Sequence, residues 1–488
     1  MKLELLPEPE LDFGAGKHVD IRFGLKHYGP VTFEVDTSPK EIQVGFVGTA
    51  KTIQGVKDWM KATSFGVAAK ESKKPNFFPA FPGFGKTSCF QCAWITGDRL
   101  ERPIPPRDIN RVITTANKAD GVKQAVELFV AECRYLTETT NVDVIICAPP
   151  VDLLNHLDAS LIAEVETDGQ EERPKENEVA QDEPAQLDMH DMLKAYCLGL
   201  RKPIQFIRPA TYDDEVKEVS RTGRRRRLQD PATCAWNFYT ALYYKGGGTP
   251  WRLRRHVSDL ETCFVGVSFY RSLDHQIVST SVAQIFNERG EGMILRGGEA
   301  QISKDDRQAH LTEDDMKNLL VRSVTEFDRE HRHVPARVVV HKTSAFNAAE
   351  LKGSNAAIDE LRIKGRDLLV IRESSVRLFR SGQYPPLRGT FLELDPRRSL
   401  LYTRGSIPFY QMYPGMYIPR ALEIDSIATE TPARTLAQEV LALTKMNWNN
   451  TQFDSALPIT LRAARQVGAI LKYASNQQEV AAGYAFYM

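Results

Sequence analysis

The sequence lacks any apolar run of about 20 residues, the length that a membrane-spanning helix requires. The first residues also lack the pattern of a secretory signal, because charge and proline interrupt their apolar stretch. Seven scattered cysteines, an odd number, do not form a disulfide framework. These absences predict a cytoplasmic protein without a membrane partner. The 488 residues, 42% hydrophobic and 26% charged, predict a globular chain of more than one domain.

Net charge is also lacking, since 63 basic residues balance 63 acidic ones, but the balance hides an asymmetry. The segment Glu164–Asp191 holds 11 acidic residues and only two basic residues. Its core, about residues 164–188, is rich in Glu, Gln and Pro, so burial cannot offset the entropy of ordering it. We expect a flexible acidic insert there, and a folded remainder that is basic.

The first half of the chain alternates between helical and strand patterns. Apolar periodicity predicts a helix over Gly121–Glu138 and a buried strand over Val142–Ala148. After the insert come a helix over Met189–Gly199, a strand over Pro203–Ile207 and a helix over Pro231–Tyr244 that stops at three glycines. Helices alternating with β-rich runs indicate a parallel sheet of the Rossmann type.

The second half opens with three strands and then alternates. The strands are expected at Cys263–Phe269, Gln276–Asn287 and Met293–Arg296. Helices and strands then follow in turn, at Thr312–His331 (helix), Ala336–His341 (strand), Ala348–Ile363 (helix), Asp367–Ile371 (strand), Pro432–Leu443 (helix) and Pro458–Tyr473 (helix). This order predicts an α/β unit that resembles ribonuclease H in outline.

Four polar side chains of the first half are candidates for an anion site. His190 and Lys194 are four residues apart on one helix, so both project from the same face. Gln205 lies on the next strand, and Lys245 ends the following helix. Together at one edge of a parallel sheet they would bind an anion such as a phosphate. From spacing alone, each could equally be a solvated helix or strand residue.

Clustered cations near these residues favour nucleic-acid contact. Interleaved aromatic residues suit stacking of bases beside phosphate contacts, although an arginine run is also typical of an exposed loop or a localisation patch. The basic residues are Arg221, Arg224–Arg227, Arg252, Arg254, Arg255 and His256, and the aromatic ones are Trp236, Tyr239, Tyr243, Tyr244 and Trp251.

The expected ribonuclease H-like half has no acid where hydrolysis would need one. In that fold, carboxylates on neighbouring strands hold two divalent cations about 4 Å apart. Here the first strand reads Val265-Gly-Val-Ser268, and the strand that ends at His341 continues as Lys342-Thr343-Ser344. Without acidic ligands on these strands, we expect no phosphodiester cleavage.

Several motifs resemble the MID and PIWI domains of Argonaute proteins. They are Tyr243-Tyr-Lys-Gly-Gly-Gly-Thr-Pro-Trp251, Phe264-Val-Gly-Val-Ser268, Val340-His-Lys-Thr343, Tyr413-Pro-Gly-Met-Tyr-Ile-Pro-Arg420 and Leu443-Thr-Lys-Met-Asn-Trp448. The opening, Leu6-Pro-Glu-Pro-Glu-Leu-Asp-Phe-Gly14 with Gly24-Leu-Lys-His-Tyr-Gly-Pro30, resembles short prokaryotic Argonautes, which lack the N and PAZ domains. The resemblance implies an N-terminal segment plus a Rossmann-like MID domain over residues 1–258 and an RNase H-like PIWI domain over residues 259–488.

The resemblance also implies roles for individual residues. His190, Lys194, Gln205 and Lys245 match the pocket that binds the 5′-phosphate of a guide strand. In relatives, a Mg²⁺ ion bridges this phosphate, the pocket glutamine and the C-terminal carboxylate, which here would be that of Met488.

The same resemblance implies that the PIWI domain is catalytically inactive. Ser268 and Thr343 stand where cleaving Argonautes carry aspartate, and neither Ala464 nor Arg465 supplies the last acid.

Short inactive Argonautes act with a partner protein, and the resemblance implies the same here. The partner carries an APAZ region and an effector: a SIR2 or TIR NAD-hydrolysing domain, or a nuclease. An RNA guide pairs with a single-stranded DNA target of an invader, and pairing activates the effector in prokaryotic immunity.

Two other functions stay open on the sequence. One is an active metal-dependent nuclease that uses other carboxylates, such as Glu291, Glu299 or Asp425. The other is an assembly subunit whose basic surface binds only an acidic protein partner.

Overall fold

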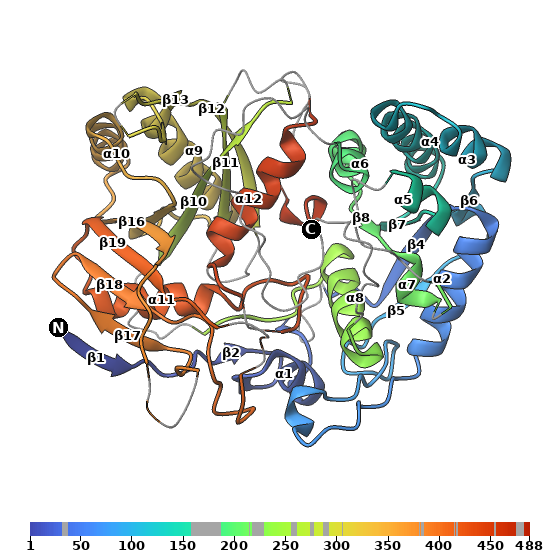
Figure 1. Ribbon diagram of the computed structural model, residues 1–488, viewed down its shortest axis with the longest axis horizontal. Coiled ribbons are helices and arrows are strands. Elements are labelled where there is room, and N and C mark those ends of the chain that lie inside the picture. Colours follow the sequence, from blue (N-terminus) through green and yellow to red (C-terminus); the bar gives the residue numbers. More distant parts are fainter. Residues whose placement is uncertain are drawn as a thin grey trace. The chain divides into compact units, whose positions relative to one another are not determined.

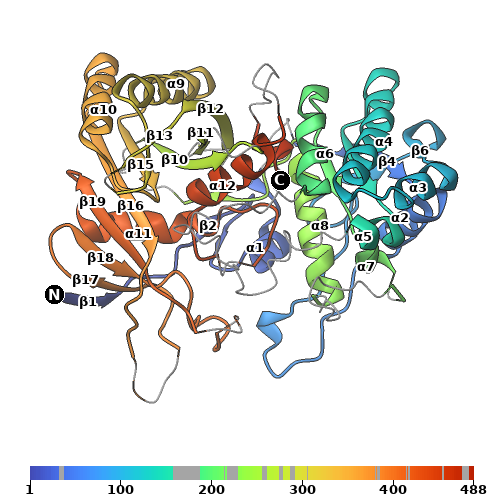
Figure 2. The ribbon, with the colours of Figure 1, turned by 45° about the horizontal axis from the view of Figure 1, so that its top comes forward.

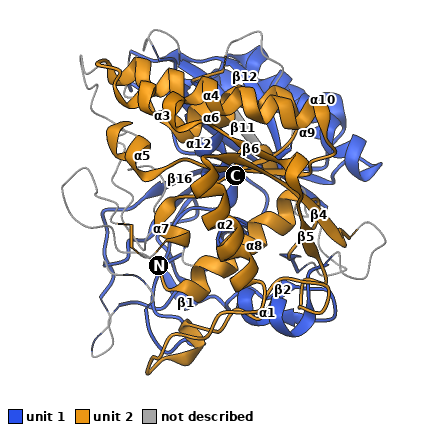
Figure 3. Cartoon of the chain, turned by 90° about the vertical axis from the view of Figure 1, so that its right-hand side faces the viewer, with its two compact units in different colours: residues 1–31, 251–472, 482–484 blue, residues 32–250, 473–481, 485–488 orange. Residues whose placement is uncertain are grey.

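A computed structural model shows two compact units, coloured separately in Figure 3. Unit 1 comprises Met1–Val31, Trp251–Lys472 and Ala482–Tyr484, and unit 2 comprises Thr32–Pro250, Tyr473–Ala481 and Ala485–Met488. The structure describes residues 1–31, 38–157, 187–213, 215–216, 229–254, 261–273, 278–285, 292–304, 306–379, 381, 385–413, 415, 418–452, 455–474 and 483–488. The expected acidic insert, apart from residues 187 and 188, lies outside this set.

The units differ from the expected domain limits at both ends of the chain. Met1–Val31 belongs to unit 1 because strand β1 (Lys2–Leu5) pairs with a strand from the second half of the chain. Ala485–Met488 belongs to unit 2, where lysine side chains bind its main-chain oxygens. The limits at residues 258 and 259 fall outside the described residues, so they stay a prediction.

Unit 2 is built on a parallel sheet whose central strand is β4 (Glu41–Gly48). The strand order is β5 (Ala93–Ile95), β4, β7 (Val144–Ala148) and β8 (Ile204–Phe206), and β6 (Glu101–Pro103) also pairs with β4. All five residues of β7 are buried, as the uninterrupted apolar run predicted.

The three helices expected in unit 2 are present as α4 (Lys118–Thr139), α6 (Met189–Cys197) and α8 (Pro231–Lys245), and side chains at their N-termini explain where they begin. Unit 2 also contains α2 (Ala50–Thr63), α3 (Pro106–Ile113), α5 (Val151–Leu157) and α7 (Pro209–Tyr212), which the sequence analysis did not predict. Asp188 accepts a hydrogen bond from the backbone of Asp191 at the start of α6. Asp230 caps α8, which has Pro231 in its first turn and ends at Gly246.

Unit 1 contains a nine-stranded mixed sheet that extends the ribonuclease H-like plan (Figure 1). Its order is β1, β17 (Thr390–Glu393), β18 (Arg398–Leu401), β19 (Leu422–Ala428), β16 (Gly365–Glu373), β15 (Arg337–Lys342), β10 (Thr262–Arg271), β11 (Val278–Ile285) and β12 (Gly292–Glu299). Strands β15 and β16 run parallel to β10, whereas β11 and β12 follow it as an antiparallel meander.

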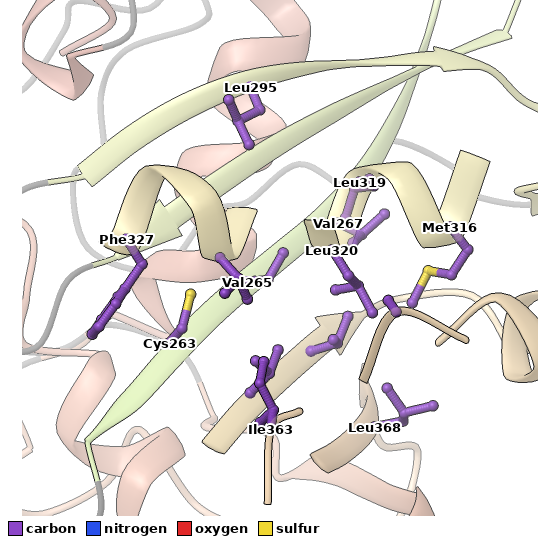
Figure 4. Packing of buried hydrophobic residues seen from close by; sticks show 14 of the residues in the cluster. Cys263, Val265, Val267, Leu295, Met316, Leu319, Leu320, Phe327, Ile363 and Leu368 are labelled. Carbon is purple, nitrogen blue, oxygen red and sulfur yellow. The ribbon is translucent and has the colours of Figure 1, made fainter. Parts of the chain in front are cut away.

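Helices cover both faces of this sheet around β10. Helices α9 (Glu313–His331) and α10 (Ala348–Leu361) lie side by side (Figure 2). Val265 and Val267 of β10 pack with apolar residues of α9 in a buried cluster (Figure 4). A Cβ atom at Gly266 would lie on the opposite face, where α12 (Ile459–Leu471) packs against β10. Alternating residues of β10 therefore contact different helix layers.

Smaller elements complete unit 1. A three-stranded sheet joins β3 (Lys17–His18), β2 (Leu11–Asp12) and β9 (Arg252–Leu253), next to helix α1 (Ile21–Tyr28). Strands β13 (Gln301–Ile302) and β14 (Ala309–His310) form a ribbon, and α11 (Ala433–Leu443) packs against β17 and β18. Among the described residues, no helix is both long and apolar enough to cross a membrane.

Candidate functional site

Helix α6 places two of the expected anion-binding residues in the interior of unit 2. His190 is 5% exposed and Lys194 is 3% exposed. The Asp188 cap fixes the start of this helix, and the hydroxyl of Tyr473 accepts a hydrogen bond from the Asp188 backbone. Burial raises the pKa of Tyr473, so this hydroxyl keeps its proton at neutral pH. The side chains of His190 and Lys194 are therefore buried and not solvated.

The ammonium group of Lys245 joins three parts of unit 2. Its Nζ donates to the main-chain oxygen of Ile204 at 3.0 Å, to Oε1 of Gln205 at 2.6 Å and to the main-chain oxygen of Met488 at 2.9 Å. Lys245 is the last residue of α8 and is 5% exposed. The structure therefore brings Gln205, Lys245 and Met488 into direct contact.

Lys194 reaches the same short segment from helix α6. Its Nζ donates to the main-chain oxygen of Tyr487 at 3.3 Å, one residue before the oxygen that Lys245 binds. The two buried ammonium groups therefore donate hydrogen bonds to the main-chain oxygens of two consecutive residues, Tyr487 and Met488. Such a pair of cations can attract an anion, because desolvated positive charge is balanced most effectively by a bound negative group.

His190 lies against the strand that carries Gln205. Its ring meets Phe206 edge-to-face, with 5.4 Å between ring centroids, and its Nδ1 lies 3.0 Å from Oδ1 of Asp191. All four expected anion-site residues are thus gathered on α6, β8 and the end of α8.

Two acidic residues of this site were missed by the sequence reading. Asp188 and Asp191 are buried, and their carboxylates and the His190 ring offer ligand atoms that lie within 4.8 Å of one another. The signal was available, because a cap residue three positions before a second acid is typical of a helix start. It was hidden because both residues also belong to the long acidic stretch of the sequence.

The two oxygens expected to hold Mg²⁺ are already bridged by an ammonium group. Gln205 Oε1 and the Met488 main-chain oxygen both accept from Lys245 Nζ. A divalent cation on both oxygens would lie within a few ångströms of Nζ, and two desolvated cations repel strongly at that separation. With Lys245 in this position, the donor set does not fit Mg²⁺.

The aromatic residues that were expected to stack on bases are in the interior. Trp236, Tyr239 and Tyr243 of α8 are fully buried, and Trp251 of unit 1 is buried as well. Within unit 2, the ring of Tyr239 stacks on those of Phe81 and Phe84. The stacking interpretation is therefore wrong for these residues, because α8 is apolar on all sides, and such a helix is buried in the core.

The basic residues near them lie partly outside the described residues. Arg221, Arg224–Arg227, Arg255 and His256 are in that category. Arg254 forms an ion pair with Glu10, and Arg252 Nε lies 3.8 Å from Asp12. These two arginines therefore have acidic neighbours within unit 1.

In unit 1, Ser268 lies on β10, and Thr343 directly follows the adjacent strand β15. Val267 of β10 is in register with Lys342 of β15. Ser268 is the residue after Val267, and Thr343 is the residue after Lys342. Buried Lys342 binds Glu350 and lies over the rings of Phe269 and Phe346. Burial lowers the pKa of Lys342, although the Glu350 carboxylate opposes this shift. The Lys342 side chain therefore lies on the face of the sheet that α9 and α10 cover, whereas Ser268 alternates to the α12 face together with Gly266.

The alternative carboxylates are not gathered around these positions. Glu299 is exposed on β12 and Asp425 lies on β19, where Arg372 Nη2 is 3.4 Å away. Four strands separate β12 from β19, which corresponds to about 24 Å at the usual strand spacing. These two acids cannot share a two-metal centre. Glu291 lies outside the described residues, whereas Ala464 is buried in α12 and Arg465 follows it.

Comparison with solved structures identifies the fold. The chain resembles Clostridium butyricum Argonaute bound to a guide DNA and a 19-mer target DNA, with a TM-score of 0.64, 14% identity and coverage of 97% of this chain and 53% of that one. Drosophila Piwi has a TM-score of 0.60 and 10% identity, with coverage of 99% of this chain and 56% of that one. Marinitoga piezophila Argonaute in complex with a 5′-OH guide RNA has a TM-score of 0.56 and 10% identity, with coverage of 100% of this chain and 59% of that one.

The fold is therefore Argonaute-like, and the predicted fold class is confirmed. This chain spans somewhat more than half the length of each of these structures. No protein-family description matches the sequence, and no curated protein sequence is significantly similar to it. Identities of 10–14% establish the fold alone.

Proposed function

We propose that this protein binds the 5′-phosphorylated end of a guide strand with His190, Lys194, Gln205 and Lys245. The observation that carries the proposal is the convergence of two buried ammonium groups on Tyr487 and Met488. A terminal phosphate that enters this site can take over donors that now bind main-chain oxygens. The Argonaute-like fold supports the same function, since two of the similar structures contain guide strands.

The test compares guides that differ only in their 5′ end. Replacing Lys194 by Ala should weaken binding of a 5′-phosphorylated guide by about tenfold or more, because charge-assisted hydrogen bonds contribute about 1.5–3 kcal/mol. Binding of the 5′-hydroxyl guide should change little. Lys123→Ala, which removes an exposed lysine of α4 in the same unit, is the matched control. Equal losses for both guides would refute the pocket assignment.

The second part of the proposal is that target recognition occurs without cleavage. Ser268 of β10 and Thr343, which directly follows the neighbouring strand β15, stand where the sequence resemblance places acids. Purified protein with guide and matched target should give no cut product with either Mg²⁺ or Mn²⁺. Specific cleavage would favour the active-nuclease alternative.

The third part concerns the biological context. We propose a short-Argonaute role, in which an RNA guide pairs with single-stranded DNA of an invader. Pairing then activates an APAZ-containing partner that carries a SIR2, TIR or nuclease effector. The sequence resemblance supports this part. Affinity purification should recover a heterodimer together with short RNA. A complex that never contains nucleic acid would favour the assembly-subunit alternative.

The Mg²⁺ ion that the sequence resemblance implies is not part of this proposal. It requires Lys245 to leave Gln205 and Met488 when the guide binds. With the lysine in its present place, the ammonium itself supplies the positive charge between these two oxygens.

A further inference from the structure

Strand β1 forms one edge of the nine-stranded sheet of unit 1. It pairs on one side with β17 in an antiparallel register that matches Leu3 with Leu392 (Figure 2). Within the part of the chain that the structure describes, no strand lies on its other side. An open edge exposes a row of backbone donors and acceptors that can pair with another strand.

The direction of these backbone groups follows from one hydrogen bond. The backbone of Leu6, which follows β1, donates to Gly389 at 2.9 Å on the β17 side. Because backbone groups alternate along an antiparallel strand, Lys2 and Glu4 also face β17 with their donors and acceptors. Leu3 and Leu5 therefore present theirs at the open edge.

The side chains at this edge are unusually apolar for a solvent-exposed strand. Leu3 is 64% exposed and Leu5 is 51% exposed, and both lie on the opposite sheet face from Glu4. Leu392, the neighbour of Leu3, is almost completely buried. Lys2–Leu5 contains neither proline nor a bulge, so its protection as an edge rests on its short length and on the charges of Lys2 and Glu4.

Charge favours the Leu3-centred register over its two neighbours for pairing with an identical strand. An antiparallel pair centred on Leu3 places Lys2 opposite Glu4 of the second copy, and Glu4 opposite its Lys2. A pair centred on Lys2 or on Glu4 would instead place like charges opposite each other, which is destabilising. The Leu3-centred register also pairs outward-facing backbone groups with each other, so the two Leu3 residues exchange two hydrogen bonds.

We propose that β1 pairs antiparallel with β1 of a second copy of this chain, centred on Leu3, so that the two sheets become continuous. The interface is isologous, with the same residues contributed by both copies. A strand pair this short buries much less than the roughly 1,200 Å² of a standard interface, so the association is expected to be weak and concentration-dependent. It does not depend on guide binding.

Cysteine cross-linking tests the register directly. In the proposed pair the two Leu3 Cα atoms are about 5.5 Å apart, a distance that a disulfide spans. The two Leu5 positions are four residues out of register, or about 13 Å apart. Under a mild oxidant, Leu3→Cys should give a covalent dimer in high yield, whereas Leu5→Cys, on the same strand and face, should remain monomeric. The unsubstituted protein measures the background from the native cysteines.

A charge exchange distinguishes a second copy from a different partner. Lys2→Glu should reduce the dimer fraction measured by light scattering at high protein concentration, and the double variant Lys2→Glu, Glu4→Lys should restore it. Glu4 also forms an ion pair with Arg434, so the thermal unfolding midpoint of each variant must be compared with that of the unsubstituted protein.

Equal cross-linking of the two cysteine variants, or none of Leu3→Cys at any concentration, would overturn the proposal. So would a folded double variant that stays monomeric. If instead the β1 variants lose a different copurifying protein, the edge serves that partner and self-pairing is refuted.

Discussion

The ammonium of Lys245 lies 2.9 Å from the main-chain oxygen of Met488, which is 243 residues further along the chain. The same group bonds Gln205 at 2.6 Å, so one lysine connects helix α8, strand β8 and the segment Ala485–Met488. This arrangement provides the first prediction, because it places a cation where Mg²⁺ was expected.

Removal of divalent metal should affect the unsubstituted protein and a Lys245 variant differently. With Lys245 present, chelation by EDTA should change the affinity for a 5′-phosphorylated guide by less than about threefold, because the ammonium already joins the two oxygens. Lys245→Ala should weaken binding and make the remainder dependent on Mg²⁺. Filter binding with and without millimolar Mg²⁺ measures both. Strong EDTA sensitivity of the unsubstituted protein would support the metal site instead.

Salt dependence should report the contact between Lys194 and the guide phosphate. For single strands, the slope of log affinity against log salt is about −0.7 for each phosphate neutralised. Lys194→Ala should therefore reduce the steepness of this slope by about 0.7, whereas the exposed Lys123→Ala control should leave it unchanged. A slope that is identical in all three proteins would show that Lys194 does not contact the guide.

Acidification should destabilise unit 1 through His341. Burial lowers the pKa of this histidine to about 3, and its Nδ1 lies 2.8 Å from Oγ1 of Thr460. Because the pKa is depressed in the folded state, the stability is fully present above the unfolded value of about 6.5 and is lost as the pH falls toward 3. Between pH 7 and pH 5 the loss from this residue is about 2 kcal/mol.

Denaturant unfolding at several pH values measures that loss. The variant His341→Gln should be less stable at pH 7 but should show a flatter dependence on pH between 7 and 5. A variant with the same pH dependence as the unsubstituted protein would assign the effect to other groups.

Gly266 should not tolerate even a methyl group. A Cβ atom at this position would overlap the main-chain oxygen of Thr460 in α12, so the helix must move away from β10. Gly266→Ala should lower the stability by about 3 kcal/mol, the upper range for overpacking a core. Gly97→Ala is the matched control, since nothing lies within 4 Å of the position that its methyl group would take. Thermal unfolding of both variants provides the comparison.

Local patterns predicted many elements of both units. The periodicity of residues 121–138 identified most of α4 (Lys118–Thr139), and the apolar run before Pro149 identified β7. In contrast, β1 and β17–β19 were not predicted. Strands of four residues, such as β17, carry little periodicity, and their pairing partners are distant in sequence.

The candidate site was predicted in its membership but not in its contacts. The spacing of His190 and Lys194 placed them on one helical face, and Gln205 on the next strand. It could not show that Lys245 bonds Gln205, or that Asp191 lies against His190. The sequence analysis also placed the aromatic residues of α8 on a surface, because it weighed the neighbouring arginines and not the evenly apolar character of the helix, which indicates burial.

The sequence by itself determined where many of the longer helices and several of the strands form, and that neither Ser268 nor Thr343 is an acid. Those properties depend on side-chain type and on neighbours within a few residues. Only the tertiary structure decided that Lys194 and Lys245 meet the segment Ala485–Met488, and that β1 has an open edge. Such contacts depend on how distant elements pack, because burial and hydrogen bonding between them are set by the whole fold.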